Sequence, residues 1–268
     1  MKLVTFGCSF IEGDELLPNT FQYKNTHNIG GVINSNYKFD EYVNFGNNGA
    51  SNERIILQIL EYINSEYYNS DDFILVGLSG LNRNLKYLNE HKFAFTIPNW
   101  SYEDHIKNTN HFLSKDEDFK SYMELVFKYE VNNRNEIVQY FLNCMTIKSL
   151  LSTFKKYLIF QSIDSPLELY KNIKNDMDWK EINMLYSTTN SNYEKQSNLF
   201  FNKKIIEKII KSNLNENQIW LNFSNTTYKS FLHSDDKYIA HGGHPNELGA
   251  KMFFKKVLKK YIDKILDF

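Results

Sequence analysis

A serine and a histidine near opposite ends of the chain have the residue types that nucleophilic catalysis needs. Ser9 follows the apolar stretch of residues 2–6, and His244 is held by the proline after it. A serine at a tight turn from strand to helix is exposed beside N–H groups that stabilise negative charge, and a histidine can remove its proton. Alone, such a serine is more often a turn residue. Together, Ser9 and His244 form a candidate nucleophile and general base.

Further polar residues follow the second and third apolar stretches and could stabilise an oxyanion. Gly49 lies in NFGNNGASN, where a missing Cβ would let a backbone N–H approach an oxygen closely. Asn82 lies in GLSGLNR and could donate a side-chain N–H to the same oxygen. Ser79 is closer to the end of the predicted strand, so either Asn82 or Ser79 could complete the site. Ligands of open parallel sheets bind outside the carboxyl ends of the strands, where these groups would meet.

Five short apolar segments must position these groups, and they have the character of buried parallel strands. Amphipathic helical patterns alternate with them, one with Ser51 or Asn52 as its N-cap and one closing the chain from Asn246. The alternation predicts a three-layer α/β/α sandwich around a flavodoxin-like, five-stranded parallel sheet. The predicted strands are residues 2–6, 42–45, 73–78, 157–161 and 219–223.

Two stretches, at about residues 84–150 and 164–215, exceed what a minimal α/β unit needs. Both are polar, Asn-rich and aromatic, with helical patches at residues 137–154 and 202–212. We interpret them as helical insertions over the strand ends, where lids and substrate walls usually lie, although they could simply enlarge the scaffold. Without a linker or an internal repeat, residues 1–268 are expected to form one domain.

The polar blocks, taken in order, resemble those of the SGNH/GDSL hydrolase family. That family carries Gly-Asp-Ser near the N-terminus, then N-x-G-x-x-G, then G-x-N-D, and D-x-x-H-P near the C-terminus. This chain has GCS at residues 7–9, NFGNNG at 44–49, GLNR at 80–83 and HGGHP at 241–245. The GCSF and GASN blocks look most like bacteriophage and bacterial branches of the family. The resemblance covers the five-strand scaffold and neither insertion.

The resemblance implies a serine esterase that needs no cofactor and no metal. Ser9 would be the nucleophile and His244 the base, and the N–H groups of Ser9 and Gly49 would form the oxyanion hole with the Asn82 side chain. The implied substrate is a small-molecule or glycan ester, with O-acetyl carbohydrates among the candidates.

The chain departs from the family pattern at two positions. Cys8 replaces the aspartate of Gly-Asp-Ser, which is not the nucleophile, so activity need not suffer. His241 stands where the triad aspartate precedes the base by three residues, and an imidazole cannot supply its negative charge. Asp235 or Asp236 could reach His244, or a backbone carbonyl could orient its ring and leave a Ser-His dyad. Alternatively, catalysis has been lost, which would leave a binding or structural module, for example in a phage or surface assembly.

Two other chemistries fit the same residues less well. His241 and His244 form a His-x-x-His pair, but glycines separate them and no cysteine or carboxylate stands at a metal-site spacing. Cys8 could be an activated thiol at a strand end. Its side chain should point away from that of Ser9, so we expect a core position instead.

The composition argues against several other classes of protein. Hydrophobic residues make up 42% of the 268 residues, enough for a large core, and the formal net charge is −1, unlike a nucleic-acid-binding protein. The lysines of residues 255–264 have the spacing of a solvated helix face. No apolar run reaches the roughly 18 residues of a membrane span. Two cysteines and no secretory leader predict a cytoplasmic protein, or a virion-associated one if a phage encodes it.

Overall fold

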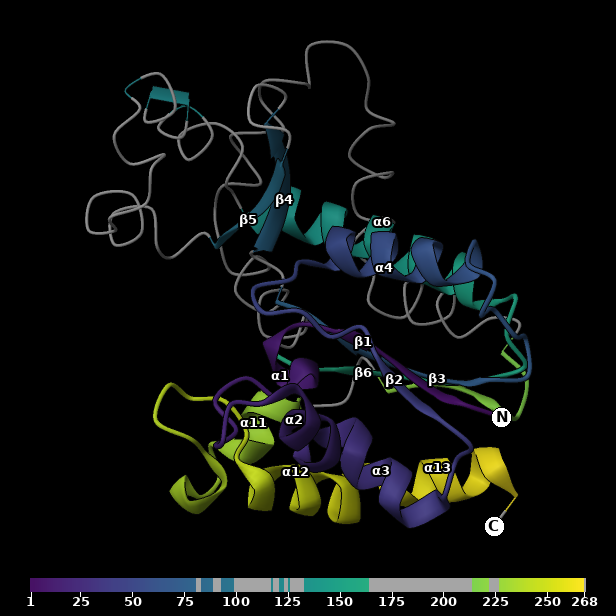
Figure 1. Cartoon of the computed structure of the whole chain (residues 1–268). Coiled ribbons are helices and arrows are strands. Elements are labelled where there is room, and N and C mark those ends of the chain that lie inside the picture. Colours follow the sequence, from purple (N-terminus) through teal and green to yellow (C-terminus); the bar gives the residue numbers. More distant parts are fainter. Residues whose placement is uncertain are drawn as a thin grey trace, which may run out of the picture.

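A parallel β-sheet forms the centre of the computed structural model (Figure 1). Its strands run in the order β2-β1-β3-β6-β7, and every neighbouring pair is parallel. Helices cover both faces, so the predicted three-layer α/β/α sandwich is confirmed. The order reverses between β1 and β3, as in flavodoxin-like sheets, and such a switch point is where ligands bind. The strands are β1 (Leu3–Gly7), β2 (Tyr42–Asn44), β3 (Phe73–Leu78), β6 (Lys156–Gln161) and β7 (Gln218–Trp220).

The structure describes residues 1–80, 83–88, 93–98, 117, 121–122, 125, 133–163, 214–221 and 227–267. The helical patch predicted at residues 202–212 and the oxyanion candidate Asn82 lie outside these ranges. Among the described residues, no helix combines the length and the apolar content that crossing a membrane requires.

Side chains alternate along the buried strands and so build two cores, one on each face of the sheet. Leu3 of β1 packs into the core shared with α3 (Ile29–Tyr37), α12 (Glu247–Phe253) and α13 (Lys259–Leu266). Val4, the next residue, packs into the core shared with α4 (Asn52–Ile63) and α6 (Asn133–Leu151). This period of two is that of a strand buried on both faces.

The helix starts follow local capping rules. Ser51 caps α4 by accepting a hydrogen bond from the Arg54 N–H, and Asn246 caps α12 by accepting one from the Gly249 N–H. Both caps are among those predicted. The remaining helices are α1 (Ser9–Glu12), α2 (Phe21–His27), α11 (Tyr228–Leu232), the 3₁₀-helix η4 (Asp236–Tyr238) and the π-helical turn η5 (Phe254–Leu258).

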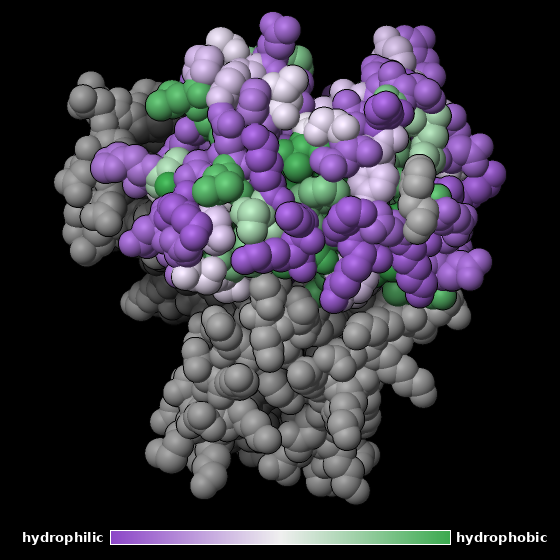
Figure 2. Space-filling model, turned by 90° about the horizontal axis from the view of Figure 1, so that it is seen from below, coloured by the Kyte–Doolittle hydropathy of each residue, from purple (hydrophilic) through white to green (hydrophobic). Residues whose placement is uncertain are grey.

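The outer face of the layer that contains α3, α12 and α13 is largely hydrophilic, with scattered apolar residues (Figure 2). Lys255, Lys256, Lys259 and Lys260 are exposed here, as expected for a solvated helix face.

The first insertion begins with strands rather than helices. β4 (Arg83–Leu88) and β5 (Phe93–Pro98) form an antiparallel pair, so the purely helical expectation is wrong here. Aromatic and β-branched residues dominate β5, and they favour a strand. The helical patch predicted at residues 137–154 corresponds to α6.

Candidate active site

Ser9 lies where β1 ends at the switch point of the sheet. The chain leaves Gly7, passes through extended Cys8 and begins the one-turn helix α1 at Ser9. The Ser9 side chain is buried, so the expectation that it is exposed is wrong, and its Oγ lies 2.9 Å from Nε2 of His244. Residues 235 positions apart in sequence are thus within hydrogen-bond distance. A serine hydroxyl can transfer its proton to an imidazole in this arrangement.

Two contacts within the loop before α12 and one contact from α1 hold His244 in place. Its carbonyl accepts a hydrogen bond from the Ala240 N–H at 2.8 Å, and Pro245 forms a β-bridge with Ile239. The Phe10 ring packs against the imidazole with the ring centroids 5.2 Å apart. Because backbone and ring contacts both restrain this loop, the imidazole is held at Ser9.

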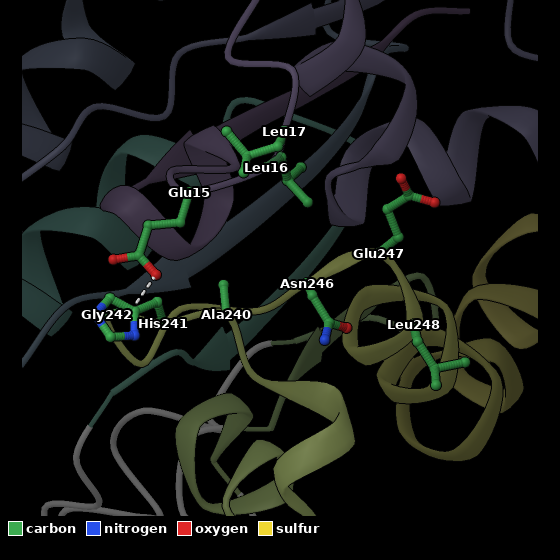
Figure 3. Close-up of a pocket in the computed structure, with 9 residues that line it drawn as sticks. All are labelled: Glu15, Leu16, Leu17, Ala240, His241, Gly242, Asn246, Glu247 and Leu248. Carbon is green, nitrogen blue, oxygen red and sulfur yellow. Dashed lines mark hydrogen bonds between the residues drawn. The ribbon is translucent and has the colours of Figure 1, made fainter.

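A carboxylate that the sequence analysis missed faces the other nitrogen of the imidazole. Oε1 of Glu15 lies 3.1 Å from Nδ1 of His244, a distance at which the two form an ion pair when the imidazole is protonated, although the contact does not meet the geometry of a hydrogen bond. The second oxygen, Oε2, accepts a hydrogen bond from the Gly242 N–H at 2.7 Å. Figure 3 shows the Glu15 side chain reaching toward Gly242, with this bond dashed.

The surroundings of Glu15 favour its charged form. Burial alone would raise the pKa of the Glu15 carboxyl, but the N–H of Gly242 and the ring and backbone N–H groups of His244 outweigh it. The net effect lowers the pKa of this carboxyl below its ordinary value of 4.5. At neutral pH, Glu15 is therefore a carboxylate.

The acidic residues expected near His244 lie elsewhere. Asp235 caps η4 and pairs with Lys237, while Asp236 is exposed within η4. His241 is exposed and lines a pocket. Among the described residues, none of these three makes a hydrogen bond or an ion pair with His244.

Gly49, the predicted oxyanion donor, has a backbone conformation that favours glycine. Its φ of 73° lies in the left-handed region, and nothing lies within 4 Å of where a Cβ would be. Its loop is tied to the end of β1, because the Asn47 N–H donates to the Gly7 carbonyl at 3.0 Å. Within the described residues, the backbone N–H groups of Ser9 and Gly49 donate no hydrogen bond to another backbone group.

Ser79 is buried and already committed to hydrogen bonds. Its hydroxyl donates to the Ala50 carbonyl at 2.6 Å, and its N–H donates to Oδ1 of Asn52 at 2.9 Å. These bonds join the end of β3 to the start of α4. Ser79 is thus placed to brace the loop that contains Gly49.

The structure also places the residues of the thiol and metal alternatives. Cys8 is fully buried in the core, and burial raises the pKa of its thiol, which disfavours the reactive thiolate. In the part of the chain that the structure describes, no three His, Cys, Asp or Glu side chains group as metal ligands.

A pocket of about 730 Å³ borders the site on the Glu15 side (Figure 3). Leu16 and Leu17 line it from the loop after α1. His241 lines it from the loop before α12, and Leu248 lines it from α12 itself. Ser9 and His244 are not among its lining residues, whereas Glu15 is.

Comparison with known proteins gives a fold neighbour only. No protein-family model and no curated protein matches the chain. Among solved structures with a similar fold is a member of the lipolytic protein G-D-S-L family from Veillonella parvula DSM 2008. The two chains are 12% identical, 97% of each is covered, and the TM-score is 0.46. Similarity at this level does not show a shared function, which must be argued from the site.

Proposed function

We propose that this chain is a serine ester hydrolase of SGNH type. The observation that carries the proposal is the 2.9 Å contact between Ser9 Oγ and His244 Nε2, at the switch point of a flavodoxin-like sheet. Both residues lie near the carboxyl ends of the strands, where the ligands of such sheets bind. The four sequence blocks that resemble the family support the same assignment.

The reaction has two halves. Ser9 Oγ attacks the acyl carbonyl as its proton passes to Nε2 of His244, and a C–O bond to the serine forms. The tetrahedral intermediate collapses, its bond to the alcohol breaks, and the imidazole returns the proton to the departing oxygen. Water, deprotonated by the same nitrogen, then attacks the acyl-enzyme. The acid is released and the Ser9 hydroxyl is restored.

The oxyanion would rest on fixed donors. The N–H groups of Ser9 and Gly49 supply two of them, and we assign the third to the side chain of Asn82. Donors that are already oriented stabilise the developing charge without reorganisation, and each contributes about 10²- to 10³-fold in kcat. No cofactor is needed for these steps.

The substrate we propose is a small-molecule or glycan ester with a short acyl group, such as an O-acetyl carbohydrate. A panel of p-nitrophenyl esters of increasing acyl length, together with acetylated sugars, would rank the acyl and alcohol groups.

A fluorophosphonate probe tests the proposal directly, because it reacts with an activated serine hydroxyl. We expect the wild-type protein to be labelled, with the adduct located by peptide mass spectrometry on Ser9. Ser9→Ala should abolish labelling and lower ester turnover by at least about 10³-fold. Ser152→Ala is the matched control, since Ser152 is exposed and away from the site.

A wild-type protein that neither reacts with the probe nor hydrolyses any ester in the panel would overturn the proposal. It would then favour the non-catalytic binding module. Labelling that persists in Ser9→Ala would instead show that another residue is the nucleophile.

A further inference from the structure

The position that holds the acidic member of the family's triad is occupied here by a histidine that turns to solvent. His241 is exposed, while the Nδ1 atom of His244 faces the carboxylate of Glu15 at 3.1 Å. The charge that should stabilise a protonated base is thus present, but it comes from the opposite end of the chain.

We infer that Glu15 is the residue that positions His244, so that the carboxylate follows the nucleophile by six residues instead of preceding the base by three. This inference rests on the proposed function. Glu15 would hold the imidazole with its proton on Nδ1, which leaves Nε2 free to accept the proton of Ser9.

The backbone around Glu15 is built to hold this carboxylate. Gly13, with a φ of 88°, ends α1, and its N–H and that of Asp14 both donate to the Ser9 carbonyl at 3.1 Å. Glu15 itself has a φ of 66°, a left-handed conformation that costs a non-glycine residue free energy. Leu16 is buried and anchors the next position. The nucleophile and the carboxylate are therefore fixed by one turn.

The loop that carries His244 leaves room for the carboxylate. A Cβ atom at Gly242 would lie 1.6 Å from Oε1 of Glu15, so no other residue fits there without displacing the carboxylate. The Gly242 N–H also holds Oε2 at 2.7 Å. Gly242 of the HGGHP block thus leaves room for the Glu15 carboxylate and also donates a hydrogen bond to it.

The other charged residues near this turn pair with one another and not with Glu15. Lys24 lies 3.1 Å from Glu12 and 4.0 Å from Asp14, so the two other carboxylates near this turn share a lysine. Within the described residues, Glu15 forms an ion pair with His244 and with no other residue. The side chains of Glu15 and His244 are 29% and 19% exposed, so the pair is only partly screened by water.

Three variants test the inference. Glu15→Gln should lower kcat by about 10²-fold with little change in KM, because the amide cannot stabilise the imidazolium. Glu15→Asp keeps the charge and should recover at least about tenfold over Glu15→Gln. Asp14→Asn is the matched control from the same turn, and it should stay within about threefold of wild type.

A spectroscopic measurement separates positioning from a structural role. Long-range ¹H–¹⁵N correlation NMR reports which nitrogen of His244 carries the proton, with the signal assigned by its loss in His244→Ala. We expect the Nδ1–H form in wild type and a changed tautomer in Glu15→Gln, while the thermal midpoint shows whether the variant is folded.

Two results would overturn the inference. One is wild-type kcat and tautomer in Glu15→Gln, and the other is a Glu15→Asp variant as impaired as Glu15→Gln. The NMR measurement needs no turnover, so it decides the role of Glu15 even if the wild type hydrolyses no ester. Failure of the proposed function would show instead in the absence of labelling at Ser9.

Discussion

The Gly242 N–H donates to the Glu15 carboxylate at 2.7 Å, although the two residues are 227 positions apart in the sequence. The bond joins the turn after the nucleophile to the loop that carries the base. It also explains why a glycine stands at residue 242, since a Cβ there would collide with Glu15.

Gly242→Ala should therefore impair the site through Glu15. The added methyl group must push the carboxylate away from Nδ1 of His244, and we expect kcat/KM to fall by about 10²-fold. A double-mutant cycle with Glu15→Gln checks whether the effect acts through Glu15. The alanine should lower kcat/KM far less once the carboxylate is gone. Strictly additive losses would contradict a shared mechanism.

Returning a carboxylate to residue 241 should compensate for the loss of Glu15. His241 and Glu15 line the same pocket, and residue 241 precedes the base by three residues. We expect Glu15→Gln/His241→Asp to exceed the kcat of Glu15→Gln by about tenfold. His241→Asp alone is the control, and it should change kcat little because Glu15 already serves His244. A double variant no faster than Glu15→Gln would argue against this exchange.

Ser79 and Asn82 should respond differently to replacement by alanine. Ser79→Ala removes a buried hydrogen bond to the Ala50 carbonyl and should lower the free energy of unfolding by about 1–3 kcal/mol. Most of the kcat should remain at a temperature where the variant is folded. Asn82→Ala should lower kcat by about 10²-fold with little effect on stability. Urea unfolding and steady-state kinetics measure the two effects, and the reverse pattern would assign the oxyanion donor to Ser79.

The pairing of Glu15 should make stability depend on pH in a defined direction. Because folding lowers the pKa of this carboxyl below 4.5, its contribution is present above that pH and is lost as the pH falls through the folded-state value. Wild type should exceed Glu15→Gln by less than about 1 kcal/mol near neutral pH, and the difference should shrink at about pH 3. Urea unfolding at both pH values measures it, and a difference that grows in acid would contradict the assignment.

The scaffold was predictable because its signals are local. Apolar strands and capping residues such as Ser51 and Asn246 stand out in a short window of sequence. Ser9 and His244 could be paired because the carboxyl ends of parallel strands share one edge.

Glu15 could not be found in the same way. The family pattern directs attention to acidic residues in the segment just before the base, which here are Asp235 and Asp236. Its placement depends on a left-handed backbone at residue 15 and on the approach of a loop more than 220 residues away, and neither has a local signature. The available clue was indirect. Gly242, beside the base, marks a place where another part of the chain comes close.

The hydrogen bonds from Gly13 and Asp14 to the Ser9 carbonyl bind the serine and the glutamate into one rigid unit. Of the three groups, only the imidazole arrives on a separate segment. A shift of the loop that carries His244 would break the contacts with Ser9 and Glu15 in the same movement. The arrangement of all three side chains therefore depends on the position of this one loop.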